Sequence, residues 1–429
     1  MRLVLVDWPS AKRYHFDPLA LSRPIFALRC GMSSLGEKLI RKWQADHVVL
    51  IMPPYMEAVY RADSYRPVNE IDRIFEPPDD VLFVHGRVKA SGWEYPSIGP
   101  SEVILDSDGE LLVARVSRDD LQKLDRSSLE GLLKSIPENL PLVEAEVPTW
   151  QYIWDLILAN PDQIREDFAA MGRYGMEGTV EQPFALRGNA DDLYIAPGAL
   201  VHPMVVIDVH GGPVYIDTDA EIHPFTRIEG PCYIGRRTIL YGAKCREGNS
   251  FGPVCRIGGE VEESIIQGYS NKYHDGFLGH AYVGEWVNLG ALTTNSDLKN
   301  DYSQVEVILD GRRPIPTGST KVGSLIGDHT KTSIGTLLNT GAYVGAMALI
   351  TGTGKPLPKF IPSFAWFLDG IVTKGYGKKK LYETAQVAMS RRRHRWTPAM
   401  EAMWDKIYEM TAPVRDEAIK RGRRSLAPG

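Results

Sequence analysis

Apolar residues recur at every sixth position through the second half of the chain. Two runs show this spacing most clearly: Ile195, Val201, Ile207, and then Ile216, Ile222, Ile228, Ile234, Leu240. A helix repeats its apolar face every 3.6 residues and an ordinary strand every two, so neither explains a period of six. The pattern predicts a parallel β-helix over residues 190–370, in which each flat face supplies one inward aliphatic residue per six. Stacked coils should lie ~4.8 Å apart.

The first 180 residues follow a different pattern, in which short apolar runs alternate with amphipathic stretches. Ser34 and Glu37 have the spacing of a capping box, which predicts a helix from there through about Trp43. A second helix is predicted at 54–62. Strands are predicted at 3–6, 48–52 and 81–84, and a hairpin at 103–105 with 111–116. Strands that alternate with helices favour an open α/β domain over residues 1–180.

Helical spacing returns at 150–160, where Asn160-Pro161 has the form of a cap and first position of a further helix. Amphipathic helices are also predicted at Leu381–Met389 and Ala399–Met410, so residues 371–429 form a helical C-terminal segment. That segment holds 14 Lys and Arg against 6 Asp and Glu. We interpret its positive charge as a solvated helical face, with contact to RNA or a membrane as the alternative.

Composition narrows the class of protein. A chain of 429 residues predicts two or three domains, and the net charge of −5 argues against general nucleic-acid binding. The four cysteines form no CxxC pair, which argues against zinc and a disulfide framework and indicates a reducing cytosol. No apolar run reaches the ~18 residues of a membrane span, so no membrane partner is expected.

The candidate chemistry lies in a polar, glycine-rich stretch, residues 268–301, that interrupts the six-residue repeat. His274 stands there with Asn295 further along. A neutral imidazole suits the removal of a proton from an attacking amine, and Asn295 or a carbonyl would hold its tautomer. Backbone N–H groups at Gly276–Gly279 or Gly290 would bind an oxyanion. The alternative is a loop histidine without a role. We predict surface positions at solenoid turns for the other histidines of this region: His202, His210, His223, His280 and His329.

Several motifs carry a resemblance to a known family. They are Asp7-x-Pro9, Ser22-Arg23-Pro24, Leu28-Arg29-x-Gly31, Gly258-Gly259-Glu260, the run Gly268-Tyr-Ser-Asn-Lys-x-His274-Asp-Gly-Phe-Leu-Gly279, and Ile361-Pro-Ser-Phe-x-Trp366. The chain resembles the bifunctional N-acetylglucosamine-1-phosphate uridylyltransferase and glucosamine-1-phosphate N-acetyltransferase family. It is most similar to a divergent, Bacteroidetes-like branch of sugar nucleotidyltransferases that carry a hexapeptide-repeat acyltransferase domain.

This resemblance implies a left-handed β-helix, a cytoplasmic homotrimer, and acetyl-CoA as the acyl donor to an amino-sugar phosphate in UDP-N-acetylglucosamine biosynthesis. His274 falls where the family has its catalytic base, with Asn295 beside it. Arg246, Asn271 and Lys272 fall at substrate-binding positions. Glu263 stands where we would align a phosphate-binding lysine.

In the first domain the resemblance implies UTP and Mg²⁺. The loop after the first strand, Asp7–Arg13, contains no glycine, so Lys12, Arg13 and Arg23 are the groups left to bind nucleotide phosphates. His85-Gly86-Arg87 ends the third strand where such enzymes place a metal-binding aspartate. Mg²⁺ would then need Asp7, Asp17 or Asp155.

Three functions are compatible with these patterns. The first is a sugar-nucleotide enzyme whose β-helix N-acetylates an amino-sugar 1-phosphate and whose first domain is a diverged nucleotidyltransferase. The second keeps only nucleotidyl transfer, with the β-helix as a trimerising scaffold. The third is a non-catalytic protein that senses a sugar nucleotide. The missing glycine loop favours the third function for the first domain, while the His274 motif opposes it for the β-helix.

Overall fold

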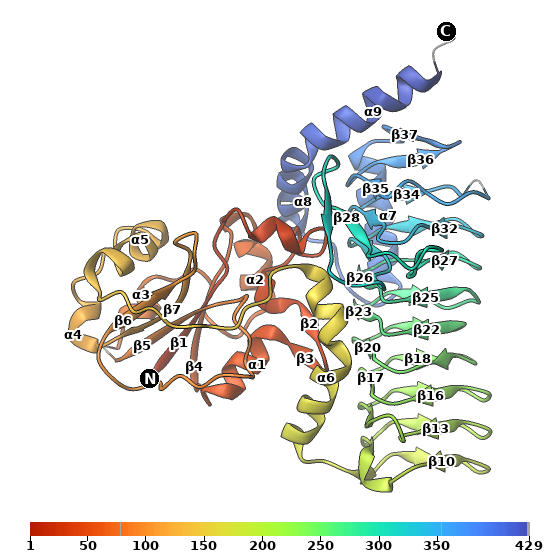
Figure 1. Ribbon diagram of the computed structural model, residues 1–429, viewed down its shortest axis with the longest axis horizontal. Coiled ribbons are helices and arrows are strands. Elements are labelled where there is room, and N and C mark those ends of the chain that lie inside the picture. Colours follow the sequence, from red (N-terminus) through yellow and green to blue (C-terminus); the bar gives the residue numbers. More distant parts are fainter. Residues whose placement is uncertain (78, 353, 427–429) are drawn as a thin grey trace.

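The chain folds into an α/β domain that lies against the side of a tall β-helix, with three helices at the C-terminal end (Figure 1). This computed structural model describes residues 1–77, 79–352 and 354–426. Within these ranges no helix is long and apolar enough to cross a membrane.

The first domain is built on a five-stranded sheet in the order β4-β1-β5-β7-β6. Its parallel strands are β1 (Arg2–Val6), β4 (His47–Ile51) and β5 (Val81–His85), and the hairpin is β6 (Glu102–Leu105) with β7 (Leu111–Val116). These elements confirm the predicted strands and hairpin. The three parallel strands are buried almost throughout, so their apolar runs pack on both sheet faces.

Helices and short turns surround this sheet. They are α1 (Leu35–Lys42), α2 (Glu57–Asp63), α3 (Asp72–Phe75), α4 (Arg118–Leu121) and α5 (Leu129–Asn139), the 3₁₀ turns η1 (Arg13–Phe16), η2 (Ile25–Ala27) and η3 (Pro54–Met56), and the two-stranded β2 (Arg29–Cys30) with β3 (Ser33–Ser34). The capping box at the start of α1 is confirmed, because Ser34 accepts from the Glu37 N–H while the Glu37 carboxylate accepts from the Ser34 N–H.

A single helix, α6 (Ile153–Met171), joins the first domain to the β-helix. The prediction that Asn160-Pro161 begins a separate helix was wrong. Asn160 is wholly buried; its side-chain oxygen accepts from the Gly31 N–H at 2.7 Å and its amide donates to the Gly248 carbonyl at 2.8 Å. The side chain that looked like a cap therefore holds α6 between the two domains, and this packing outweighs the cost of a proline inside the helix.

The β-helix has three faces of parallel strands. The first face contains β8 (Gly175–Met176), β11 (Leu193–Ile195), β14 (Val214–Ile216), β17 (Cys232–Ile234), β20 (Asn249–Phe251), β23 (Ile265–Gly268), β26 (Tyr282–Glu285), β30 (Leu325–Ile326), β33 (Tyr343–Val344) and β35 (Phe360–Ile361). The second contains β9 (Thr179–Val180), β12 (Leu200–Val201), β15 (Glu221–Ile222), β18 (Ile239–Leu240), β21 (Arg256–Ile257), β24 (Asn271–Lys272), β31 (Lys331–Thr332), β34 (Leu349–Ile350) and β36 (Trp366–Leu368). The third contains β10 (Ala185–Arg187), β13 (Val206–Asp208), β16 (Arg227–Glu229), β19 (Lys244–Cys245), β22 (Glu260–Glu262), β25 (Phe277–Gly279), β27 (Thr294–Asn295) and β32 (Leu337–Leu338).

The six-residue period is the spacing between neighbouring faces of this solenoid. Ile195 pairs with Ile216, and Ile216 with Ile234, so this column of inward residues is aliphatic and buried through these coils. The predicted parallel β-helix is confirmed. Its first coil begins at Gly175, ahead of the predicted boundary at 190, and the 3₁₀ turn η4 (Ala190–Asp192) lies within it.

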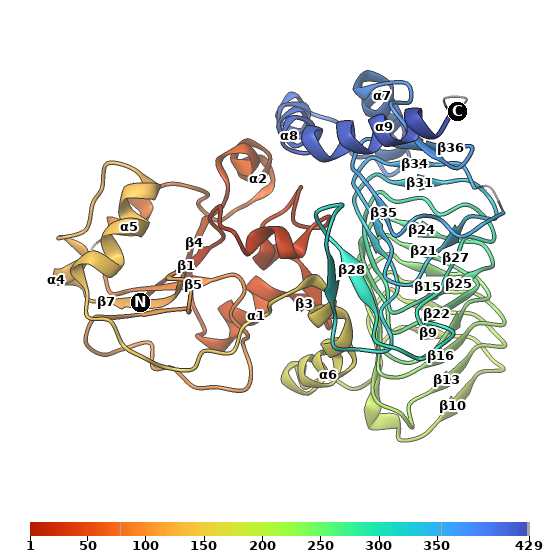
Figure 2. The ribbon, with the colours of Figure 1, turned by 45° about the horizontal axis from the view of Figure 1, so that its top comes forward.

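Two additions fasten the β-helix to the rest of the chain. The hairpin β28 (Glu306–Ile308) with β29 (Pro314–Pro316) leaves the solenoid and packs on an apolar cluster that includes Phe16, Ile25 and Trp154 of the first domain and α6. Beyond β37 (Ile371–Thr373) come α7 (Lys378–Ser390), α8 (Pro398–Met410) and α9 (Ala412–Leu426). Figure 2 shows these helices at the C-terminal end of the solenoid, with α8 close to α2.

Candidate functional site

The His274 loop lies at the rim of a cavity on the β-helix. The cavity has a volume of about 620 Å³, and its lining comes from successive turns of the solenoid: His223, Pro224, Phe225, Tyr241, Gly242, Gly259, Tyr273, His274, Asp275, Ala291 and Leu292. The aromatic members form a ladder, with ring centroids 5.1 Å apart for His223 and Tyr241 and 5.5 Å apart for Tyr241 and Tyr273. Such an open, partly aromatic hollow has the size of a small-molecule site.

The imidazole of His274 is exposed and packs edge-on against Tyr273, with ring centroids 5.7 Å apart. Within the described residues no hydrogen bond or ion pair engages the ring. Both of its nitrogens are therefore available to a substrate in the cavity.

Lys272 holds the backbone of this loop from inside. It follows Ile257 in the second-face register, so its stem occupies a core position that is aliphatic in the preceding coils. Its ammonium donates to the carbonyls of Gly258 at 3.0 Å and His274 at 2.5 Å. Burial lowers the pKa of Lys272 to about 8. A side chain at Gly259 would collide with this ammonium, since a Cβ there would lie 2.8 Å from Nζ.

Asn295 supports the strand that follows the loop. Its side-chain oxygen accepts from the Gly279 N–H and its amide donates to the Gly279 carbonyl, both at 2.8 Å. The amide thus fixes the end of β25 and does not contact the His274 ring. The Gly290 N–H likewise donates to Thr332 at 2.9 Å, so the predicted oxyanion donors at Gly279 and Gly290 are already engaged.

Arg246 and Asn271 lie outside the cavity. Arg246 forms an ion pair with Glu262 at 2.7 Å, and Asn271 lies between Asn288 at 3.1 Å and Arg392 of the C-terminal segment at 3.0 Å. Of the residues predicted to act on the amino sugar, the structure brings His274 alone into the cavity lining that it describes.

A second cavity, of about 490 Å³, lies in the first domain at the carboxyl ends of β1 and β5. Its lining includes Trp8, Pro9 and Ser10 after β1, His85 at the end of β5, and Lys134 of α5. Ligands of open α/β sheets bind at this edge, outside the carboxyl ends of the parallel strands.

The cations predicted to bind nucleotide phosphates point elsewhere. Lys12 pairs with Asp106 at 2.6 Å and Asp108 at 2.5 Å. Arg13 is buried, with its Nε on Asp7 at 3.0 Å and Nη2 on backbone carbonyls. Arg23 is buried against Asp328. None of the three is among the described residues that line the cavity.

The carboxylates predicted for Mg²⁺ do not fit a hydrated metal site. Asp7 accepts from the Arg13 guanidinium, and Asp155 accepts from the Gln151 and Tyr152 N–H groups at the start of α6. Burial raises the pKa of Asp17 to about 7, although Arg13 acts in the opposite direction. Asp7 is wholly buried beside a guanidinium and Asp155 caps a helix, whereas Mg²⁺ keeps several of its waters and needs more open carboxylates.

Two of the histidines predicted at the surface are in fact buried. His280 contacts Asp297 through Nδ1 at 2.8 Å and Glu263 through Nε2 at 3.2 Å. Burial alone would lower the pKa of His280, but these two carboxylates raise it to about 9. His329 is buried beside Trp286 and Trp404, and burial lowers its pKa. The surface prediction was wrong because Asp297, in the segment between β27 and β30, covers His280, and Trp404 of α8 covers His329.

The comparisons with known proteins agree with this architecture. Residues 3–174 match the family model for sugar nucleotidyl transferases. A bifunctional sugar-1-phosphate nucleotidylyltransferase/acetyltransferase from Sulfurisphaera tokodaii is 36% identical over 151 residues, covering 32% of this chain and 35% of that protein. The bifunctional protein GlmU from Thermotoga petrophila is 27% identical over 181 residues, covering 38% and 37%. The chain thus spans about a third of the length of these relatives.

Among solved structures, the UDP-N-acetylglucosamine acyltransferase of Francisella novicida aligns with 56% of this chain and 90% of its own, at 12% identity and a TM-score of 0.32.

Proposed function

We propose a role in sugar-nucleotide biosynthesis for this chain. Its residues 3–174 match the family model for sugar nucleotidyl transferases, and a β-helix follows them. Its β-helix N-acetylates an amino-sugar 1-phosphate, with glucosamine-1-phosphate as the first acceptor to test and acetyl-CoA as the donor. The relatives named as bifunctional nucleotidylyltransferase and acetyltransferase support this pairing of two activities.

The observation that carries the proposal is the free His274 ring at the rim of the 620 Å³ cavity. In the reaction the amine nitrogen attacks the thioester carbonyl, a C–N bond forms and the C–S bond breaks. His274 accepts the proton that the nitrogen loses, and the departing thiolate takes up a proton. Lys272 acts as a positioning residue, because its ammonium holds the His274 carbonyl.

The test is acetyl transfer by the full-length chain and by His274→Ala. Losing the base should reduce turnover by ~10²–10⁴-fold and leave acetyl-CoA affinity nearly unchanged. His210→Ala is a matched control, since His210 is an exposed solenoid histidine that pairs with Asp208 away from the cavity. Unchanged turnover in His274→Ala would remove the assignment.

A second candidate activity is nucleotidyl transfer in the first domain. The cavity at the carboxyl ends of β1 and β5, together with the family match, favours it. Calorimetry with UTP should detect binding that Trp8→Ala weakens, since Trp8 lines that cavity. If neither UTP nor a sugar nucleotide binds, this activity is excluded and the β-helix acts alone. Binding of both ligands without turnover in either domain would instead favour the non-catalytic sensor.

A further inference from the structure

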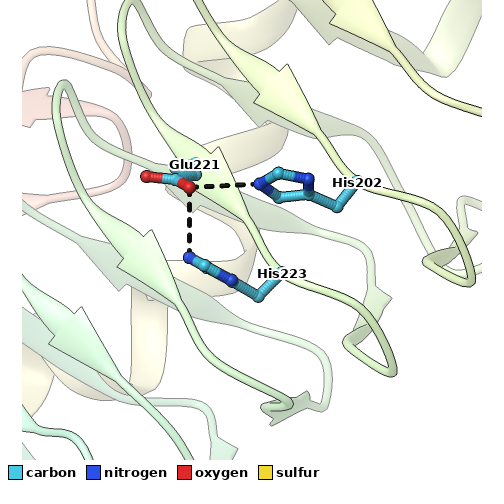
Figure 3. A group of neighbouring side chains, drawn as sticks. All are labelled: His202, Glu221 and His223. Carbon is cyan, nitrogen blue, oxygen red and sulfur yellow. Dashed lines mark hydrogen bonds and ion pairs between the residues drawn. The ribbon is translucent and has the colours of Figure 1, made fainter.

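Two histidines and a glutamate meet on the outer surface of the β-helix. Figure 3 shows the rings of His202 and His223 both directed at the carboxylate of Glu221. The Nε2 atoms of His202 and His223 lie 3.1 and 3.2 Å from one and the same oxygen, Glu221 Oε1. One ligand atom from each residue lies within 4.8 Å of the other two. The three potential ligand atoms therefore lie close together.

The solenoid itself produces this convergence. His202 follows β12, while Glu221 and His223 flank the inward residue Ile222 of β15 in the next coil. The His202 N–H donates to the Ile222 carbonyl at 2.9 Å, which fixes the separation of the two coils. The two imidazoles consequently lie side by side, with their centroids 5.0 Å apart and their planes tilted by 36°. Rigid strands of this kind hold ligands more reliably than a loop would.

A further carboxylate orients His202. Its Nδ1 lies 2.9 Å from Glu181 Oε2, one coil earlier, while its Nε2 faces Glu221. A carboxylate that accepts from the outer nitrogen of an imidazole fixes the tautomer whose other nitrogen binds a metal.

We propose that His202, Glu221 and His223 bind one Zn²⁺ ion, with Glu181 as the positioning residue for His202. A tetrahedral ion with ligand bonds of ~2.0–2.2 Å separates its ligand atoms by roughly 3.3 Å, close to the two distances found here. Imidazole nitrogens favour zinc over the hard cations Mg²⁺ and Ca²⁺. The three side chains are 23%, 36% and 28% exposed, so an ion can enter and keep a water molecule.

This site adjoins the candidate acetyl-transfer cavity, because His223 belongs to the lining of both. Zn²⁺ binding at this site is nevertheless independent of acetyl transfer, because it is measured without any acceptor sugar or acetyl-CoA.

The test uses the full-length chain, freed of metal with a chelator and titrated with Zn²⁺ by calorimetry, and with Co²⁺ followed by visible absorption. One equivalent per chain is expected, with tetrahedral Co²⁺ bands. His202→Ala and His223→Ala should each weaken binding by at least ~10²-fold, and Glu181→Gln by ~10–100-fold. His210→Ala, which changes another exposed histidine on the solenoid, should bind as the wild type does.

Three results would overturn the proposal. The first is a wild-type chain that binds no Zn²⁺ at micromolar concentration. The second is wild-type affinity in His202→Ala and His223→Ala, each shown to be folded by circular dichroism. Binding lost only in Glu263→Gln would also refute it, because that residue belongs to a separate group with Glu247 and Glu262. Should either alanine variant fail to fold, Glu221→Gln provides the same comparison.

Discussion

Arg23 and Asp328 form a two-point ion pair across the junction between the first domain and the β-helix. Nη1 and Nη2 of the guanidinium donate to the two carboxylate oxygens at 3.0 and 2.6 Å, and Ser22 donates to the same carboxylate at 2.7 Å. Both charges are buried, and Glu285 lies 3.5 Å from the guanidinium. The fork geometry and the burial of both groups indicate that this pair fixes how the two domains dock.

Arg23→Ala should destabilise the junction. The substitution leaves Asp328 as an unpaired carboxylate in a buried site, and breaking such a pair costs ~3–5 kcal/mol. Denaturant unfolding would show the loss, and solution scattering would show the domains separating. The exposed pair of Arg187 and Asp208 is the control, for which Arg187→Ala should cost below ~1 kcal/mol. A stable Arg23→Ala chain with weakened UTP binding would instead return Arg23 to the role of nucleotide ligand.

Lys272→Met should impair acetyl transfer more than it impairs folding. Methionine fills the same core column, but it removes the donors that hold the carbonyls of Gly258 and His274. A shifted His274 would lower kcat by ~10–10²-fold with little change in acetyl-CoA affinity. Steady-state kinetics and calorimetry separate the two effects. Lys244→Met, on the exposed side of β19, should change neither, and an unaltered kcat in Lys272→Met would contradict the positioning role.

The His280 cluster should stabilise the fold at neutral pH and lose that effect in alkali. The folded pKa of about 9 lies above the ordinary value of 6.5, so the contribution is complete below pH 6.5 and disappears as the pH rises through 9. Its size is about 3 kcal/mol. His280→Gln should therefore be much less stable than the wild type at pH 6 and similar to it at pH 10. Denaturant midpoints at the two pH values measure this, and a difference independent of pH would refute it.

We expect the β-helix to assemble as a homotrimer. The proposed acetyl-transfer cavity opens between coils on the outer surface and carries exposed apolar side chains, among them Phe225 and Leu292, that a neighbouring copy would cover. Mass photometry should give three times the chain mass of 47.9 kDa. A species at the mass of one chain, at micromolar concentration, would contradict the prediction. Phe225→Asp should then shift a true trimer toward that smaller species.

The sequence by itself determined the elements whose signals are local or periodic. A six-residue repeat has a single structural explanation, since it matches neither helix nor strand, and the buried columns through Ile216 and Ile234 follow from it. The capping box at Ser34 and the hairpin of β6 and β7 also depend on residues close together in the chain. The polar stretch around His274 interrupts an otherwise regular repeat, which predicted a site there, and the structure has a cavity at this position.

The tertiary structure decided which side chains meet. From the sequence, Arg23 was predicted to bind phosphate, but in the fold it pairs with Asp328, 305 residues away. Asn160 was predicted to cap a helix, but its side chain instead bonds to the backbone of Gly31 and Gly248. The sequence separation of His202 and His223 shows that they are neighbours only when the number of residues in one coil is known. Burial and charge pairing depend on which surfaces folding brings together. A local sequence pattern does not specify the distant segment that will cover it.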